Sequence, residues 1–255
     1  MIGAIIGDIA GSCYEFNNTS DYNFPMFSRE KDFTDDTICT VAVADAILKD
    51  IDFQTSLKRW CRKFPHPMGE YGGYFYKWIM SDDARPYGSY GNGSAMRVSP
   101  VGWLFYNEQD VRNQAEITAA VTHNHPEGIK GAVAIAVAIF RMRNASTKSS
   151  AIFENVAKEF YGYDAFSNLP RRGVFDVTCQ GCVPLALYLA SRATSFEDAI
   201  RIAVSYGGDT DTVGAIVGSL AEAQYDIPDK MIQQAKSYLP QEMLDIIAEF
   251  EKKRR

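Results

Sequence analysis

Two short segments, far apart in the chain, each combine two aspartates with two threonines directly before an apolar run. The first is FTDDTICTVA at residues 33–42, and the second is YGGDTDTVGA at residues 206–215. Asp and Thr are favoured at helix N-termini, where their oxygens accept hydrogen bonds from unpaired backbone amides and oppose the positive end of the helix dipole. Helix capping therefore explains either segment alone, yet one cap needs only one side chain.

The carboxylates of both segments enter helices that are apolar enough to be buried, and an isolated buried charge is very costly. Hard divalent cations such as Mg²⁺ bind oxygen ligands, and threonine hydroxyls are acceptable neutral donors beside carboxylates. The scarcity of histidine near these aspartates argues against zinc. We therefore interpret the two segments as the two halves of one binuclear metal site, each half carried by a helix N-terminus.

A third segment, GDIAGSCYE at residues 7–15, carries two more carboxylates, Asp8 and Glu15. They are about two helical turns apart, so they would lie on roughly the same side of a helix. Glycines recur at positions 3, 7 and 11. This spacing puts the three glycines on one helix face and predicts close packing against a neighbouring helix.

Two further segments offer groups that could bind a nucleotide. PYGSYGNGSAMR at residues 86–97 is a glycine-rich loop whose backbone amides could approach phosphates, although any glycine-rich turn looks similar. THNHPE at residues 122–127 brings two imidazoles to the start of a helix that opens with Pro126. For this segment the alternative is a plain helix connection with solvated imidazoles.

In chain order, five of these segments resemble the motifs of the ADP-ribosylglycohydrolase family: GDIAGSCYE, FTDDT, GSYGNGSAMR, THNHPEGIKGA and GGDTDT. They run from Gly7 to Thr212, and FDVTCQGCVP at residues 175–184 resembles the compact bacterial branch of that family. The family includes the dinitrogenase-reductase-activating glycohydrolases and the animal enzymes that remove ADP-ribose from arginine or serine. One motif would be weak, whereas five in register are specific.

The resemblance implies an orthogonal all-α fold with a binuclear magnesium centre, in which manganese sometimes takes the place of magnesium. Six residues match metal ligands of the family: Thr34, Asp35, Asp36, Asp209, Asp211 and Thr212. Glu15 matches the mobile active-site glutamate. Five residues match positions that bind the nucleotide: Gly88, Ser89, Tyr90 and Asn92 in the loop for the diphosphate, ribose and adenine, and His123, which reaches the bound nucleotide.

By this resemblance, the substrate is ADP-ribose linked to an acceptor, and the reaction is hydrolysis of the glycosidic bond. We expect the metals to hold the cis-diol of the distal ribose, and the transition state to be oxocarbenium-like. Glu15 would position or deprotonate the attacking water. Larger members carry extra loops that engage target proteins, but this chain has little sequence between Glu15 and Thr34. Arginine-linked ADP-ribose is the default substrate, and serine linkage or a small ADP-ribosyl metabolite stays open.

Two other functions compete with this interpretation. A two-metal phosphoester hydrolase would use the same acidic clusters and would turn over simple phosphoesters. A non-catalytic ADP-ribose binder, or a structural relative such as the jellyfish lens crystallins, would show loss of metal ligands. All six candidate ligands and Glu15 are present here, but a fold alone does not guarantee function.

Composition sets limits on the class of protein. The 255 residues are 46% hydrophobic and 23% charged, as in a globular protein, and we expect a single domain over residues 1–255. A net charge of −6 argues against a nucleic-acid or anionic-membrane partner. The N-terminal stretch MIGAIIGDIAG is a poor signal peptide and too short to span a membrane. The oligomeric state stays open.

Five cysteines without a scaffold-like spacing indicate a reducing cytoplasm. The pair Cys179 and Cys182 has the spacing of half a zinc site or of a redox pair. No second such pair follows, and the histidines are distant in sequence. We therefore expect both sulfurs to behave as small hydrophobic groups on the apolar side of a helix.

Long segments rich in Ala, Leu, Ile and Met predict an all-α fold of about ten packed helices. The expected helices are 36–49, 116–123, 127–143, 176–192, 196–206, 211–224, 229–238 and 241–253. Two stretches, 16–33 and 62–98, are rich in Gly, Pro, Asn and aromatic residues and are expected to be irregular loops. Loops of that length in a compact domain are often functional.

Overall fold

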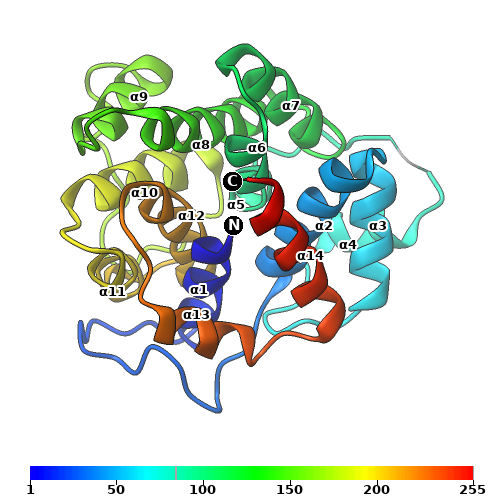
Figure 1. Cartoon of the computed structure of the whole chain (residues 1–255), viewed down its shortest axis with the longest axis horizontal. Helices are drawn as coiled ribbons and strands as arrows, with labels where there is room; N and C mark the ends of the chain where they lie inside the picture. Colours follow the sequence, from blue (N-terminus) through cyan, green and yellow to red (C-terminus); the bar gives the residue numbers. More distant parts are fainter. Residues whose placement is uncertain (84, 255) are drawn as a thin grey trace.

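The computed structural model describes residues 1–83 and 85–254, and over these residues the fold is all-α, as predicted (Figure 1). A short 3₁₀ helix, η1 (Ser12–Tyr14), follows the first α-helix. The α-helices are α1 (Ile2–Gly11), α2 (Asp35–Lys49), α3 (Phe53–Lys63), α4 (Gly73–Met80), α5 (Gly93–Met96), α6 (Ser99–Leu104), α7 (Glu108–Ala120), α8 (Pro126–Asn144), α9 (Ala151–Tyr161), α10 (Cys179–Arg192), α11 (Phe196–Tyr206), α12 (Thr210–Gln224), α13 (Asp229–Lys236) and α14 (Gln241–Lys253).

The centre of the molecule is a tightly packed pair, α1 and α12 (Figure 1). The glycine stripe of α1 faces the backbone of α12, so that a Cβ atom placed on Gly7 would lie 1.9 Å from the carbonyl oxygen of Gly214. Gly3 meets Gly218 in the same way, with 2.3 Å between such a Cβ and the carbonyl oxygen. The close packing predicted from the glycine spacing is therefore confirmed.

This packing fixes where the functional segments lie. The residues of α12 from its start at Thr210 to Ala223 are buried, because small and apolar side chains cover all sides of the helix. Helix α2 packs against α1 and is covered by α3 and α14. The N-termini of α2 and α12, which carry the two Asp-Thr segments, therefore come together beside the C-terminal end of α1.

Several expected helices agree closely with the structure, notably 196–206 with α11 and 127–143 with α8. The expected helix 116–123 is wrong in its bounds, because α7 begins at Glu108 and ends at Ala120. The missed signal is Asn107, whose side chain accepts a hydrogen bond from the backbone amide of Asp110. The helix expected over 176–192 begins later, at Cys179, after the capping residue Thr178.

Helices α3, α6 and α9 were not predicted. Helices α4 and α5 correct the expectation of an irregular loop over 62–98, of which residue 84 lies outside the described residues. In α3 the buried residues Phe53, Leu57, Trp60 and Cys61 have the spacing of one helix face, a periodicity that was overlooked. No helix is assigned within 16–33.

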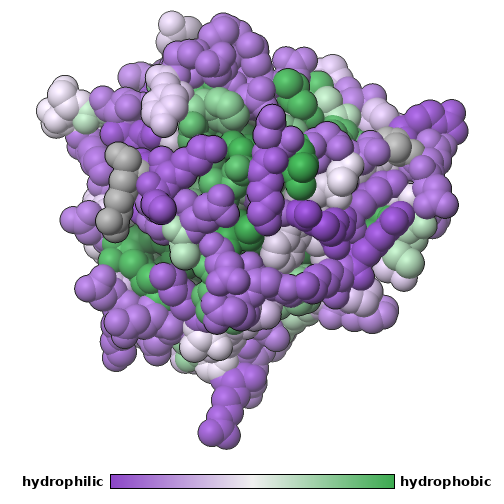
Figure 2. Space-filling model, turned by 45° about the vertical axis from the view of Figure 1, so that its right-hand side comes forward, coloured by the Kyte–Doolittle hydropathy of each residue, from purple (hydrophilic) through white to green (hydrophobic). Residues whose placement is uncertain are grey.

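In the part of the chain that the structure describes, no helix combines the length and apolarity that crossing a membrane requires. The face in Figure 2 is mainly hydrophilic, with hydrophobic groups visible between the charged side chains. A single-domain organisation stays a prediction, which a single cooperative thermal transition would support.

Candidate active site

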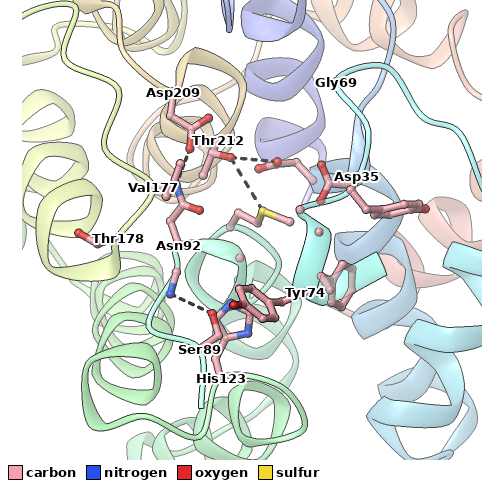
Figure 3. A pocket seen from close by; sticks show the side chains of 18 of the residues that line it. Asp35, Gly69, Tyr74, Ser89, Asn92, His123, Val177, Thr178, Asp209 and Thr212 are labelled. Atoms are coloured by element: carbon pink, nitrogen blue, oxygen red, sulfur yellow. Dashed lines mark hydrogen bonds between the residues drawn. The ribbon is translucent and has the colours of Figure 1, made fainter. Parts of the chain in front are cut away.

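A cavity of about 690 Å³ opens where the N-termini of α2 and α12 meet the glycine-rich loop (Figure 3). Asp35, Asp209 and Thr212 lie toward one end of the view, and Ser89 and His123 lie toward the other. Apart from Thr34, the residues that the sequence analysis selected line this cavity: Glu15, Asp35, Asp36, Gly88, Ser89, Tyr90, Asn92, His123, Asp209, Asp211 and Thr212. The fold therefore brings together motifs from both ends of the chain.

The two Asp-Thr segments contact each other directly. Thr212 Oγ1 donates a hydrogen bond to Asp36 Oδ2 over 3.1 Å. The other carboxylate oxygen of Asp36, Oδ1, is buried and has no hydrogen-bond partner among the described residues. A buried carboxylate oxygen without a donor is costly, so this atom indicates a missing positive group.

A second set of carboxylates converges beside this pair. Glu15, Asp209 and Asp211 each offer an oxygen atom, and these three atoms lie within 4.8 Å of one another. In the described ranges no lysine or arginine forms an ion pair with any carboxylate of the cavity. The donor atoms are all oxygens, which suits Mg²⁺ or Mn²⁺.

The uncompensated charge changes the titration of these groups. Burial, together with the negative charges of Asp211 and Asp8, raises the pKa of Glu15 to about 8. Burial and the neighbouring charge of Asp211 also raise the pKa values of Asp35 and Asp36 well above their usual range. Carboxylates that repel one another in this way are the expected setting for divalent cations.

Asp8 holds the N-terminus of α2, a function that the sequence analysis did not assign. Its Oδ2 accepts hydrogen bonds from the backbone amides of Thr34 (3.0 Å) and Thr37 (3.1 Å), and its Oδ1 accepts one from Thr34 Oγ1 (2.8 Å). Thr34 Oγ1 in turn accepts a hydrogen bond from the amide of Asp36. The Thr34 hydroxyl thus already donates one hydrogen bond and accepts another, and Thr34 does not line the cavity. Its assignment as a metal ligand stays a prediction.

The glycine-rich loop is held by hydrogen bonds that use most of its backbone amides. The partners are Gly88 N with Asn124 Oδ1 (2.7 Å), Ser89 N with Thr122 O (3.4 Å), Gly91 N with Ser89 Oγ (3.1 Å) and Asn92 N with Val177 O (2.7 Å). The amides of Tyr90 and Gly93 have no such partner in the described chain. Within residues 88–93, the backbone amides that stay available to phosphate oxygens are therefore those of Tyr90 and Gly93.

The cysteines of α10 anchor this loop. The amide of Cys179 donates to Tyr90 O over 2.9 Å, and Cys179 Sγ lies 3.0 Å from Gly91 O. Asn92 Nδ2 donates to Cys182 Sγ (3.3 Å) and to Asp209 Oδ2 (2.6 Å). Both sulfurs are buried, as expected, but their hydrogen bonds to the loop were not predicted. Asn92 thereby connects the loop to the acidic cluster.

Gly69 is a residue of the cavity that the sequence analysis missed. It has a φ of +79°, a conformation that favours glycine, and a Cβ atom placed on it would lie 2.6 Å from Glu15 Oε2. The backbone at Gly69 therefore limits where the Glu15 carboxylate can lie.

Exposed aromatic rings surround the mouth of the cavity. Phe16, which directly follows Glu15, stacks on Phe175 with 5.8 Å between ring centroids, and the two residues are 75% and 47% exposed. Tyr74 stacks on Tyr87 in the same way, at 6.2 Å. Nothing in the sequence pattern pointed to these pairs, because the two members of each pair come from separate segments of the chain.

The comparisons with known proteins agree with this geometry. The family model described as ADP-ribosylglycohydrolase matches residues 1–255. The human protein "ADP-ribosylhydrolase ARH3" is 24% identical over 335 residues, an alignment that covers 98% of this chain and 90% of the human protein. A protein of Archaeoglobus fulgidus described only as uncharacterized is 28% identical over 240 residues, which cover 80% of this chain and 76% of that protein.

A solved structure described as "ADP-ribosylglycohydrolase-related protein complex" has the same fold. Its TM-score is 0.75 at 24% identity, and the match covers 99% of this chain and 95% of that chain. With the family model spanning the sequence from end to end, the chain belongs to the ADP-ribosylglycohydrolase family.

Proposed function

We propose that this chain hydrolyses the glycosidic bond between ADP-ribose and an acceptor, with a binuclear Mg²⁺ or Mn²⁺ centre. The observation that carries the proposal is the convergence of Glu15, Asp209 and Asp211 oxygens within 4.8 Å in a cavity that the glycine-rich loop also lines. The activity of the human relative, as its name states it, supports the same class of reaction.

The proposed metal ligands are Thr34, Asp35, Asp36, Asp209, Asp211 and Thr212. The unpartnered Oδ1 of Asp36 and the lack of basic partners in the described residues support this set. When bound, divalent cations supply electrostatic stabilisation to the oxygens of the distal ribose.

Glu15 is the proposed catalytic group. It adjoins the acidic cluster without belonging to either Asp-Thr segment, and it is only partly buried, so it is accessible to solvent water from the cavity. In this function it orients the attacking water and accepts its proton as the water oxygen bonds to the anomeric carbon. The bond from that carbon to the acceptor breaks in an oxocarbenium-like transition state, and the acceptor leaves with the bonding electron pair and takes up a proton.

The other end of the cavity holds the nucleotide in this proposal. The free amides of Tyr90 and Gly93 are available to phosphate oxygens, and Gly88, Ser89, Asn92 and His123 shape the wall around them. Tyr90 packs against the ring of His125 with 5.2 Å between centroids but is 49% exposed, so the exposed part of its ring is available to stack on adenine.

Arginine is the acceptor that we favour. Phe16 directly follows Glu15 in the chain and stacks on Phe175 at the cavity mouth, and a guanidinium group packs well over aromatic rings. Serine-linked ADP-ribose or a small ADP-ribosyl metabolite would use the same catalytic groups. We place the protein in the cytoplasm, because all five cysteines are free thiols, and the net charge of −6 disfavours nucleic acid as a partner.

One assay separates these possibilities. Peptides that carry ADP-ribose on arginine, serine or glutamate are incubated with the protein and Mg²⁺, and release of ADP-ribose is followed by chromatography. Release from one peptide class, absent with Asp211→Asn, identifies the linkage. ADP-ribose binding without release from any peptide would contradict the proposal in favour of a non-catalytic binder, and turnover of simple phosphoesters alone would favour a phosphoesterase.

A further inference from the structure

We infer that Arg97 and Thr122 are positioning residues that fix the protonation pattern of His123, so that its Nε2–H group donates a hydrogen bond into the cavity. The identity of the ligand that accepts this hydrogen bond rests on the proposed function. The relay, by which we mean the chain of hydrogen bonds from Arg97 through Thr122 to His123, does not depend on the proposed function.

The relay begins at Arg97, whose side chain is 1% exposed. In the described part of the chain no carboxylate forms an ion pair with it. Arg97 Nη2 donates to Thr118 O and to Thr122 Oγ1, in each case over 2.9 Å. A guanidinium group can only donate, so Thr122 Oγ1 must be the acceptor of this hydrogen bond.

The hydroxyl proton of Thr122 then determines the state of His123. Thr122 is fully buried, and among the described residues the remaining hydrogen-bond contact of its Oγ1 is His123 Nδ1 at 2.7 Å. If Nδ1 carried a proton, the threonine hydroxyl would have no acceptor, and a buried donor without an acceptor is unfavourable. Nδ1 is therefore the acceptor and carries no proton.

A neutral imidazole with an unprotonated Nδ1 carries its proton on Nε2. The doubly protonated form is disfavoured, since burial, and to a lesser degree the charge of Arg97, lowers the pKa of His123 well below its usual value. Thr122 thus fixes the tautomer of His123 through a hydrogen bond, and the charge of Arg97 adds to burial in disfavouring the doubly protonated ring.

His123 Nε2 points toward the glycine-rich loop. Cβ atoms placed on Gly93 and Gly91 would lie 3.1 Å and 3.6 Å from it, so the loop approaches the ring closely. No hydrogen-bond acceptor for Nε2 occurs within residues 1–83 and 85–254. Because His123 lines the cavity, we assign its Nε2–H as a donor to an acceptor oxygen of the nucleotide.

Nitrogen-15 NMR on the labelled, ligand-free protein tests the relay. The chain has only three histidines, so His123 can be assigned by comparison with His123→Gln. Protonated and unprotonated ring nitrogens have well-separated shifts, and we expect a single Nε2–H tautomer in the wild type and in Thr122→Ser. Thr122→Val, which removes the hydroxyl but keeps the shape, should give a mixture. An Nδ1–H tautomer in the wild type, or an unchanged tautomer in Thr122→Val, overturns the inference.

ADP-ribose titration by calorimetry tests the donor. We expect Thr122→Val and His123→Leu to weaken binding about 5- to 10-fold, the effect of losing one hydrogen bond, and Thr122→Ser and His123→Gln to weaken it less, since both keep a donor. Equal affinity of His123→Leu and wild type would overturn the assignment of the donor. Failure of the wild type to bind ADP-ribose would contradict the proposed function, while the NMR result would still decide the relay.

Discussion

The carboxylates of the cavity and those of Glu108 and Glu159 are surrounded by opposite kinds of charge. On the surface between α7, α8 and α9, Arg112 and Arg141 each form ion pairs with both glutamates. Hydrogen bonds from Arg141, followed by those from Arg112, lower the pKa of Glu108 to about 2 against the opposing effect of burial. At Glu15 the same chemical group has no basic partner among the described residues, and burial together with neighbouring negative charges raises its pKa to about 8.

The difference separates a cluster that is complete within the protein from one that is not. The arginine-bridged cluster of Glu108, Glu159, Arg112 and Arg141 needs nothing from solution. The cavity carboxylates leave at least one buried oxygen, Asp36 Oδ1, without a partner in the described chain. Repulsion between such carboxylates lowers the stability of the cation-free protein, and a bound cation restores it.

The largest expected effect is on the chemical step. In our proposal Glu15 accepts the proton of water; Glu15→Gln removes this group but changes little of the shape, so single-turnover hydrolysis should slow by about 10²- to 10⁴-fold. Metal content and ADP-ribose affinity should stay close to wild type. In Asp211→Asn, by contrast, metal content and turnover should fall together. A Glu15→Gln rate within a few-fold of wild type would remove Glu15 from the mechanism.

The next effect concerns thermal stability. It tests whether the cavity carboxylates, unlike the arginine-bridged cluster, need a cation. Saturation with Mg²⁺ at about 100 times its Kd should stabilise the protein by about 2.7 kcal/mol and raise the Tm by about 5–10 °C relative to EDTA. Asp36→Asn should melt in EDTA at or above the wild-type temperature, because one repelling carboxylate is gone, and should lose most of the Mg²⁺ shift. Glu108→Gln is the control and should keep the full shift. The same shift in Asp36→Asn and wild type would mean that Asp36 does not bind the cation.

A smaller effect is expected at Gly69. In Gly69→Ala the new methyl group collides with the Glu15 carboxylate, and the positive φ adds strain, so kcat should fall about 10- to 100-fold through misplacement of Glu15. The Mg²⁺ shift in Tm should persist. Gly72→Ala is a matched control, since a Cβ atom there meets nothing within 4 Å. Equal kcat in both variants would show that Glu15 tolerates displacement.

The sequence predicted the parts of this site that local patterns encode. Aspartates and threonines beside helix starts, and glycines at helical spacing, follow short-range rules, so the all-α class and the close packing of α1 against a neighbouring helix were predictable, whereas the identity of that helix, α12, was not. The function of Gly69 was not, because it depends on the approach of a distant loop to Glu15. Arg97 was missed for a similar reason: a buried arginine that pairs with Thr122 rather than with an acid has no signature in the sequence.

The arginine-bridged cluster was equally hidden in the sequence. Glu108 and Arg112 have the spacing of a helical ion pair, but Arg141 and Glu159 come from other helices and meet them only through packing. Helix α9, which carries Glu159, was not predicted at all. Long-range contacts of this kind depend on tertiary structure rather than on local propensity.

The smallest predicted effect belongs to this cluster. Because Glu108 has a folded-state pKa of about 2, below its unfolded value, its contribution to stability is complete above the unfolded pKa and is lost as the pH falls through about 2. The cluster is partly exposed and screened by solvent, so we expect the contribution to be about 1 kcal/mol or less. Urea unfolding of wild type and Glu108→Gln between neutral and acidic pH measures it. The difference between the two proteins should shrink as the pH falls through the acid range, and salt should reduce it at neutral pH. A difference that does not change with pH would mean that Glu108 stabilises the fold through packing rather than charge.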